Sequence, residues 1–241
     1  MADPTDTRPV ALVTGGAGGI GRALCADLAE HGHTVVSADL VADPVPGAAH
    51  SVELDLRSAD SCRAAVAEVL DRFGRLDLLV NNAGINARGR VEDVPEQVWL
   101  PVVDVNLNGT LRMCQAAYAA LAASRGAIVN LASTGGLVAI AGSAVYGVTK
   151  AAVVHLTKVL ALEWAGAGVR VNAVAPTIVP SPMTADVVDD AEYMAAKLAS
   201  IPLGRVVDAA EVAAAARWLA SPAAGMVTGH TLPVDGGVSV L

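Results

Sequence analysis

The sequence predicts an α/β protein in which helices cover both faces of a doubly wound parallel sheet of about seven strands, in a single domain spanning residues 1–241. Short apolar runs of about five residues alternate with helical patterns of about ten residues or more, as in βαβ units. Runs such as residues 78–80 are apolar without alternation, as expected for strands covered on both faces. Right-handed crossovers then place helices on both faces of the sheet.

The first half of the chain begins this alternation. Its predicted strands are short runs rich in Val and Leu, at residues 10–14, 34–38, 51–54 and 76–80. Its predicted helices, where apolar residues recur at helical spacing, cover residues 22–30, 58–73 and 95–123. A glycine cluster at residues 15–21 joins the first strand to the first helix.

The second half continues in the same way. Predicted strands lie at residues 127–131, 169–174 and 230–234, and predicted helices at residues 145–165 and 209–219. Only residues 177–202, which contain Pro180, Pro182 and Met183, interrupt the rhythm. We predict that this segment is a mobile flap at the substrate site.

The composition limits the class of partner. Hydrophobic residues make up 54% of the chain and charged residues 17%, which excludes a disordered protein. A net charge of −8 and a pI near 5.0 argue against nucleic acid or an anionic membrane, because neither would be attracted. The N-terminal residues lack a basic region before an apolar stretch, and no apolar run approaches the ~18–20 residues that span a bilayer. We therefore expect a soluble, cytoplasmic protein.

Neither the cysteines nor the histidines predict a metal site. Cys25, Cys62 and Cys114 are odd in number and far apart, so they are interpreted as buried apolar residues in a reducing compartment. The five histidines form no HExxH motif, and no Cys/His cluster has ligand spacing.

The glycine cluster predicts a dinucleotide site. It satisfies G-x-G-x-x-G from Gly16 and G-x-x-x-G-x-G from Gly15. Glycines between a strand and a helix allow a tight turn and let a pyrophosphate approach the helix N-terminus. A P-loop is excluded, because Gly21 is followed by Arg22 and Ala23 rather than by Lys and Ser or Thr. The predicted cofactor contacts in this turn are Gly15, Gly18, Gly19, Ile20 and Gly21.

An acidic residue after the second strand indicates which dinucleotide binds. Asp39 follows the glycine cluster at about the 20-residue spacing expected for the acid that binds the adenosine ribose. Its carboxylate would accept from both ribose hydroxyls and repel the 2′-phosphate of NADP. Leu40, the next residue and also a predicted contact, supplies no cation for that phosphate, and Arg22 is interpreted as lying at the helix surface or near the pyrophosphate. The predicted cofactor is therefore NAD.

A tyrosine and a lysine at the start of the 145–165 helix predict proton transfer. Tyr146 and Lys150 stand at i and i+4 and therefore share one helical face. The lysine ammonium and the positive oxidised nicotinamide would both favour phenolate, and so lower the tyrosine pKa from its usual value of ~10. Alone, such a pair is also compatible with a surface contact.

Further motifs occur in a fixed order along the chain: Thr14-Gly-x-x-x-Gly19-x-Gly21, Asp55, Asn81-Asn-Ala-Gly84, Asn106, Ser133, Tyr146-x-x-x-Lys150, Asn172 and Pro176. With them, the chain from about Pro9 to Leu241 resembles the short-chain dehydrogenase/reductase family in its compact form of ~250 residues, whose fold is Rossmann-type.

The resemblance implies four catalytic residues. Tyr146 would be the general acid/base, and Ser133 would hold the substrate oxygen and stabilise developing charge. Lys150 would lower the pKa of Tyr146 and hold the nicotinamide ribose. Asn106 would anchor a water that links Lys150 to bulk solvent, although it could instead only satisfy buried backbone groups, as Ser133 could only cap its strand.

The resemblance also implies further cofactor contacts, while Asn81 is expected to be structural. The implied contacts are Asp55, Leu56, Asn82, Ala83, Gly84, Tyr146, Lys150, Pro176, Thr177, Val179 and Ser181. The chain departs from the family pattern at Thr177, where Gly is usual, and at Ser181, where Thr is usual. These departures affect the expected loop path and substrate subgroup.

The expected reaction is NAD-dependent interconversion of a secondary alcohol and a ketone. Ile85, Asn86, residues 134–145 and the flap mix apolar and polar side chains, which fits a polyol or sugar and also a secondary alcohol on a small apolar frame. Arg88 is either a solvated loop arginine or a partner for a substrate carboxylate or phosphate. We expect a homotetramer, with a dimer as second choice. The alternatives are an NADPH-dependent reductase of 3-oxoacyl type and a catalytically silent NAD-binding protein.

Overall fold

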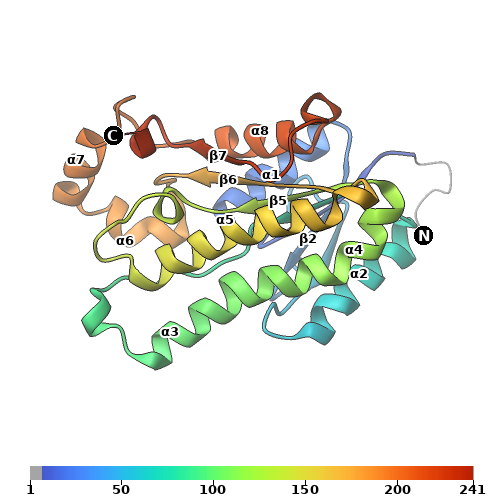
Figure 1. The fold of residues 1–241 in the computed structure, drawn as a ribbon, viewed down its shortest axis with the longest axis horizontal. Coiled ribbons are helices and arrows are strands. Elements are labelled where there is room, and N and C mark those ends of the chain that lie inside the picture. The colour runs from blue at the N-terminus through green and yellow to red at the C-terminus, as the bar shows by residue number, and fades with distance from the viewer. Residues whose placement is uncertain (1–6, 241) are drawn as a thin grey trace.

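In the computed structural model, which describes residues 7–240, seven parallel strands form one sheet in the order β3-β2-β1-β4-β5-β6-β7 (Figure 1). The strands are β1 (Val10–Thr14), β2 (Thr34–Asp39), β3 (His50–Glu53), β4 (Leu78–Asn81), β5 (Ala127–Leu131), β6 (Arg170–Pro176) and β7 (Thr231–Val234). The strand order reverses next to β1, so the predicted doubly wound α/β fold is confirmed. Residues 1–6 and Leu241 of the predicted domain lie outside the described residues.

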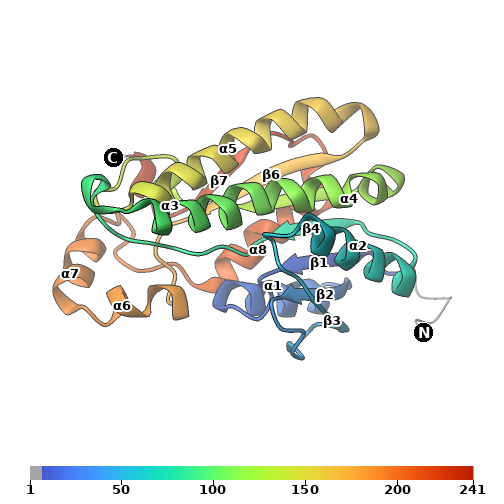
Figure 2. The ribbon, with the colours of Figure 1, turned by 90° about the horizontal axis from the view of Figure 1, so that it is seen from below.

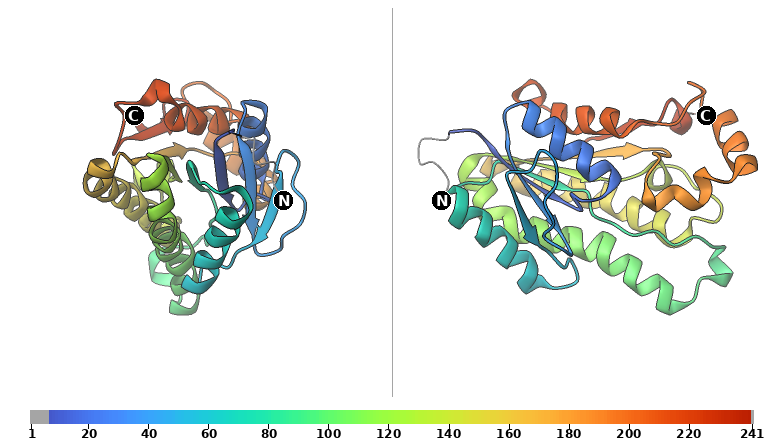
Figure 3. Two further views of the ribbon diagram at one scale, coloured as in Figure 1. Left: turned by 90° about the vertical axis from the view of Figure 1, so that its right-hand side faces the viewer. Right: turned by 180° about the vertical axis from the view of Figure 1, so that it is seen from behind.

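Two helical layers cover the sheet (Figures 1 and 3). Separate apolar cores lie on its two faces. On one face, Leu24 and Leu28 pack with Val212 and Leu219. These residues belong to α1 (Gly19–Glu30) and α8 (Ala209–Ala220). The other face is covered by α2 (Ala59–Phe73), α4 (Thr110–Ser124) and α5 (Ala144–Trp164). The carboxyl ends of all seven strands therefore face one edge of the molecule, where the predicted site residues lie.

The predicted helix at residues 95–123 is not one continuous α-helix. It consists of α3 (Glu96–Val103), a π-helical turn (Asp104–Gly109) and α4, which follow one another beside α5 (Figure 2). A π turn shifts the hydrogen-bond ladder without changing which residues are apolar, so the apolar spacing of the sequence does not reveal it. The first helix also begins earlier than expected, at Gly19 inside the glycine cluster.

The segment predicted as a flap contains helices. It includes a 3₁₀ turn (Pro182–Thr184), α6 (Ala185–Val188) and α7 (Ala191–Ala199). Short 3₁₀ turns also occur at Val91–Asp93, Thr134–Gly136, Ala165–Ala167, Pro222–Ala224 and Val238–Val240. The flap lies beyond the carboxyl end of β6, and is therefore placed at the same edge as the predicted site.

One helix is long and apolar enough to cross a membrane by length and composition alone, Ala144–Ala167. In this fold it is a core helix of the domain. Its residues Leu160 and Ala161 are buried in the apolar cluster that includes Leu12 and Ile128 of the sheet. Its apolar composition is therefore explained by packing on the sheet.

Candidate active site

The glycine cluster forms a tight turn between β1 and α1. Gly15 has a φ of 64°, a conformation that favours glycine, and its N–H donates to the Ala38 carbonyl at 2.7 Å. A Cβ on Gly21 would overlap the carbonyl oxygen of Gly15. Gly21 therefore lets the first turn of α1 pack directly on the loop, the role that the third glycine has in dinucleotide folds.

Two residues hold this turn from the neighbouring strand. The Asn82 side-chain amide donates to the carbonyls of Thr14 at 3.0 Å and of Gly15 at 2.9 Å. The backbone N–H groups of Asn82 and Ala83 both donate to the Thr14 hydroxyl, each at 3.1 Å. The predicted cofactor contact Asn82 is thus also the residue that shapes the glycine turn.

Asp39 lies at one end of a cavity of about 530 Å³ along the carboxyl edge of the strands. Its carboxylate accepts from the backbone N–H of Ala17 at 3.2 Å and of Leu40 at 2.9 Å. These two bonds hold the carboxylate in place, and a carboxylate has lone pairs left for further donors. Arg22 donates to the Ala17 carbonyl at 2.9 Å, beside the turn as expected.

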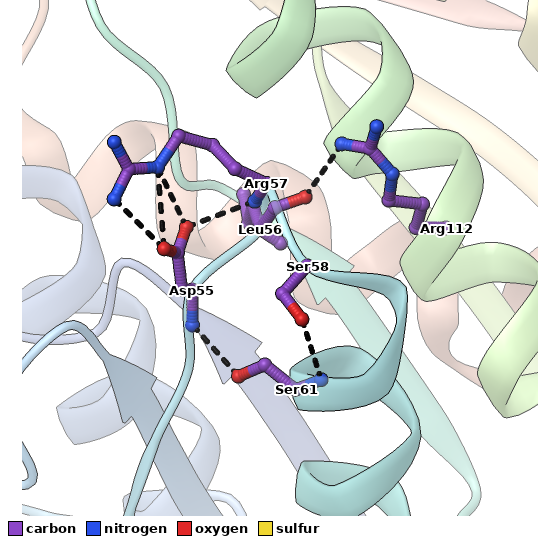
Figure 4. Close-up of polar contacts among 6 residues, drawn as sticks. All are labelled: Asp55, Leu56, Arg57, Ser58, Ser61 and Arg112. Atoms are coloured by element: carbon purple, nitrogen blue, oxygen red, sulfur yellow. Dashed lines mark hydrogen bonds and ion pairs between the residues drawn. The ribbon is translucent and has the colours of Figure 1, made fainter.

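An arginine that the sequence reasoning missed lies at the same end. Arg57 lines the cavity together with Asp55, and the two form a bidentate pair with Nε–Oδ1 at 2.9 Å and Nη2–Oδ2 at 2.8 Å (Figure 4). The Arg57 hydrogen bonds lower the pKa of Asp55 to about 2. Arg112 donates to the Leu56 carbonyl at 2.9 Å and so braces the same loop from α4 (Figure 4). The only sequence signal for Arg57 is its place two residues after Asp55.

Most of the predicted cofactor contacts line this one cavity. They are Gly15, Gly18, Gly19, Ile20, Asp39, Leu40, Asp55, Leu56, Asn82, Ala83, Gly84, Tyr146, Lys150, Pro176 and Ser181. Gly21, Thr177 and Val179 do not line it. Thr177 is buried, and among the residues of positive φ in the described chain only Arg125 is not a glycine, so threonine at this position strains no backbone.

Tyr146 and Lys150 line the other end of the cavity, whereas Ser133 and Asn106 lie outside its lining. Ser133 follows β5, and Tyr146 lies in the first turn of α5, where the two side chains are hydrogen-bonded. Lys150 lies one helical turn further on, with Nζ 5.6 Å from the centroid of the Tyr146 ring. Its ammonium donates to the Leu131 carbonyl at 2.6 Å.

Burial shifts the pKa values of Tyr146 and Lys150 in the chain without cofactor. Burial raises the pKa of Tyr146 to about 12, and the hydrogen bond from Ser133 and the charge of Arg88 oppose this only in part. Burial also lowers the pKa of Lys150 to about 8, because removal from water disfavours the ammonium. In the chain without cofactor, the Lys150 ammonium is directed at the Leu131 carbonyl, and the lowering expected from Lys150 together with a bound oxidised nicotinamide stays a prediction.

Asn106 lies in the π turn and is completely buried. Its side chain accepts from the backbone N–H of Ile85 at 2.8 Å and donates to the Ile85 carbonyl at 2.9 Å and to the Thr149 hydroxyl at 3.2 Å. Asn106 thus fixes the loop after β4 against α5. A Cβ on Gly84 would touch both Asn106 and Lys150, so the glycine lets the loop lie against them.

Two motif asparagines are structural in this fold. Asn81 donates to the side chain of Asn130 at 2.9 Å and so links β4 to β5, as expected. Asn172 donates to the Val227 carbonyl at 2.8 Å and accepts from the His230 N–H at 3.0 Å, which ties β6 to the chain before β7.

A second cavity of about 680 Å³ opens between the loop after β4 and the flap. Asn86 and Arg88 line it from the loop, and Met183 and Asp186 from the flap. Arg88 and Asp186 form an ion pair between the two walls. The side-chain oxygen of Asn86 is buried and has no hydrogen-bond partner in the described part of the chain. This cavity adjoins the first, with which it shares Gly84, Ile85, Pro182 and Met183.

Comparison with known proteins supports the resemblance seen in the sequence. The family model described as "Enoyl-(Acyl carrier protein) reductase" matches residues 15–239. The chain belongs to the short-chain dehydrogenase/reductase family. It is therefore an oxidoreductase of a family that typically uses NAD or NADP.

Relatives within the family act on different substrates. The chain is 40% identical to the D-threitol dehydrogenase of Mycolicibacterium smegmatis, covering 96% of this chain and 93% of that protein. It is 36% identical to the 3-oxoacyl-[acyl-carrier-protein] reductase of Thermotoga maritima, covering 96% and 98%. The NAD-dependent glycerol dehydrogenase of Listeria innocua is 34% identical, covering 97% and 95%.

A solved structure has the same fold over nearly the whole length. The gluconate 5-dehydrogenase of Burkholderia cenocepacia, in complex with NADP and tartrate, has a TM-score of 0.91 and 33% identity, covering 97% of this chain and 96% of that one. Polyol and sugar dehydrogenases and 3-oxoacyl reductases thus occur at comparable identity among the relatives.

Proposed function

We propose that the protein is an NAD-dependent oxidoreductase that interconverts a secondary alcohol and a ketone, with a polyol or sugar as substrate. The observation that carries this proposal is one cavity with Asp39 at one end and Tyr146 with Lys150 at the other. Such a cavity suits a dinucleotide whose adenosine ribose and nicotinamide ends must bind some distance apart.

The residues present fit a nicotinamide dinucleotide. The turn at Gly15 and Gly21 brings backbone and the N-terminus of α1 to the cavity, as pyrophosphate binding requires. Asp39 offers a fixed carboxylate that favours a ribose diol over a 2′-phosphate, which supports NAD over NADP. When bound, the nicotinamide supplies the hydride acceptor or donor.

The side chains supply position and proton transfer. Tyr146 takes the proton of the substrate hydroxyl at its phenol oxygen during oxidation and returns it during reduction. Ser133 donates a hydrogen bond to the substrate oxygen and holds it against the phenol. Lys150 holds the nicotinamide ribose and favours the phenolate. Asn106, by fixing the loop after β4, anchors the water through which Lys150 exchanges protons with solvent.

The cavity wall supports a hydroxylated substrate. Polar side chains line the second cavity from both walls, among them Asn86, Arg88 and Asp186, and can meet the hydroxyls of a polyol. Two relatives, named D-threitol dehydrogenase and NAD-dependent glycerol dehydrogenase, also favour a polyol as the substrate. We propose residues 177–202 as the flap that covers this substrate. The 3-oxoacyl reductase remains the alternative because relatives of that activity are about as similar, but Asp39 disfavours NADPH.

We also propose a cytoplasmic homotetramer, with a dimer as the second choice. Apolar side chains on the outer faces of α3 and α5 are exposed in the single chain, with Leu100 54% and Leu162 83% exposed. Exposed large apolar side chains on these two helices are compatible with packing against another copy.

The first experiment measures NADH or NADPH formation from a panel of alcohols. The panel contains D-threitol, glycerol and D-glucitol on one side, and cyclic apolar secondary alcohols on the other. We expect turnover of the polyols with NAD⁺, and a loss of about 1,000-fold or more in Tyr146→Phe while NADH affinity stays within about threefold. Undiminished turnover in Tyr146→Phe, or faster reaction with NADP⁺ than with NAD⁺, would contradict the proposal. Reduction of a 3-oxoacyl thioester without polyol turnover would favour the alternative.

A further inference from the structure

An ion pair bridges the two walls of the second cavity, which we propose holds the substrate. Arg88 comes from the loop after β4 and Asp186 from α6 in the flap, and their side chains meet across the cavity that both line. The backbone of the Arg88 loop is itself held, because Gly89 donates to the Gly142 carbonyl at 2.9 Å. The loop that carries Arg88 is therefore held in place by a backbone hydrogen bond, whereas Asp186 lies on the flap.

Arg88 is close enough to the reacting groups to affect them. Its side chain is 35% exposed, and its charge acts to lower the pKa of Tyr146. A guanidinium in such a place would bind the carboxylate of an acidic substrate in a bidentate manner. In this structure, however, the guanidinium of Arg88 is already paired with the carboxylate of Asp186.

We propose that Asp186 determines specificity at this cavity: by occupying Arg88, it makes the enzyme select neutral polyols and reject polyhydroxy acids. The inference rests on the proposed function, whose substrate class it narrows.

The discrimination comes from charge repulsion rather than from the strength of the ion pair. Asp186 is 62% exposed, and an exposed pair of this kind contributes only about 0–1 kcal/mol. An acidic substrate that displaced it would leave two carboxylates beside one guanidinium. A neutral polyol is not repelled by Asp186, so the ion pair discriminates by excluding negatively charged substrates.

The test compares two substrates that differ only at C1, which is a CH₂OH group in D-glucitol and a carboxylate in D-gluconate. For Asp186→Asn, we expect the ratio of kcat/KM for D-gluconate to that for D-glucitol to rise at least about tenfold over the wild type. Asp189→Asn is the matched control. It removes the same charge from the same flap, and Asp189 makes no ion pair among residues 7–240, so its ratio is expected to change less than about twofold. In Arg88→Gln/Asp186→Asn, the gain should disappear, because the guanidinium that would receive the carboxylate is gone.

A binding measurement tests the role of Asp186 independently of the proposed function. The affinity of the NADH-loaded protein for D-gluconate, measured by calorimetry, needs no turnover. We expect Asp186→Asn to bind D-gluconate at least about tenfold more tightly than wild type, with weaker binding at high salt. Equal affinity in the two proteins, or a wild type that prefers D-gluconate, would overturn the role of Asp186. Failure of the wild type to oxidise any polyol would instead overturn the proposed function, whatever the binding result.

Discussion

Replacement of Lys150 by Met is expected to make the protein more stable at neutral pH while it abolishes turnover. Lys150 is only 4% exposed, and within residues 7–240 its ammonium has a single hydrogen-bond acceptor, the Leu131 carbonyl at 2.6 Å. Burial of a charge with so little compensation destabilises the folded state. The same charge is needed at the Tyr146 end of the cavity, where we propose that it holds the ribose and favours phenolate.

The lowered pKa of Lys150 sets the size of the expected gain in stability. A shift from 10.5 to about 8 corresponds to about 3 kcal/mol of unfavourable free energy when the lysine is charged in both states, as at pH 7. Loss of the hydrogen bond to Leu131 offsets about 1 kcal/mol of this. Lys150→Met should therefore unfold with a free energy about 1–3 kcal/mol higher than that of wild type at pH 7.

The pH dependence has a definite sign. Below pH 8 the lysine is protonated in both states, and the penalty is complete. Between pH 8 and about 10.5, the folded protein has released the proton while the unfolded chain still holds it, so the wild type becomes more stable as the pH rises. The advantage of Lys150→Met should thus shrink by about 2 kcal/mol between pH 7 and pH 9.5.

Urea unfolding of the cofactor-free proteins at pH 7.0, 8.0, 9.0 and 9.5 measures the difference in free energy of unfolding between Lys150→Met and wild type. Lys158→Met is the control, because Lys158 is exposed on the same helix and its replacement should change stability by less than about 0.5 kcal/mol at every pH. Kinetic assays of the same preparations should show a loss of about 100-fold or more in kcat for Lys150→Met. A variant that is less stable than wild type at pH 7, or a stability difference that does not change with pH, would refute the reasoning from burial.

Three further outcomes follow from the site. Asp39→Ser should raise the ratio of kcat/KM for NADP⁺ to that for NAD⁺ by about 100-fold, because the carboxylate that repels the 2′-phosphate is removed; an unchanged ratio in initial-rate assays would contradict this. Gly21→Ala places a Cβ on the Gly15 carbonyl and should cost about 1–3 kcal/mol in urea unfolding, whereas Gly166→Ala, which has nothing within 4 Å, should be nearly neutral. Since burial raises the pKa of Tyr146 to about 12 in the cofactor-free protein, the ultraviolet titration of wild type minus that of Tyr146→Phe should show no tyrosinate below pH 10, and a phenolate near neutral pH would contradict this.

The sequence by itself determined the parallel sheet, the glycine turn and the pairing of Tyr146 with Lys150. These features depend on local rules: the length and apolarity of strands, the conformational freedom of Gly15, and the four-residue spacing that places two side chains on one helical face. Asp39 also belongs to this group, because the end of β2 necessarily lies next to the turn that follows β1.

Only the tertiary structure decided which distant residues meet. It brought Arg57 to the adenosine end of the cavity, placed the Asn106 side chain on the backbone of Ile85, and paired Arg88 with Asp186 across 98 positions of sequence. It also buried Tyr146, which raises the pKa of this residue in the chain without cofactor. The physical reason is the same in each case: burial and long-range contacts depend on every neighbour that folding gathers around a group, and no spacing along the chain records them.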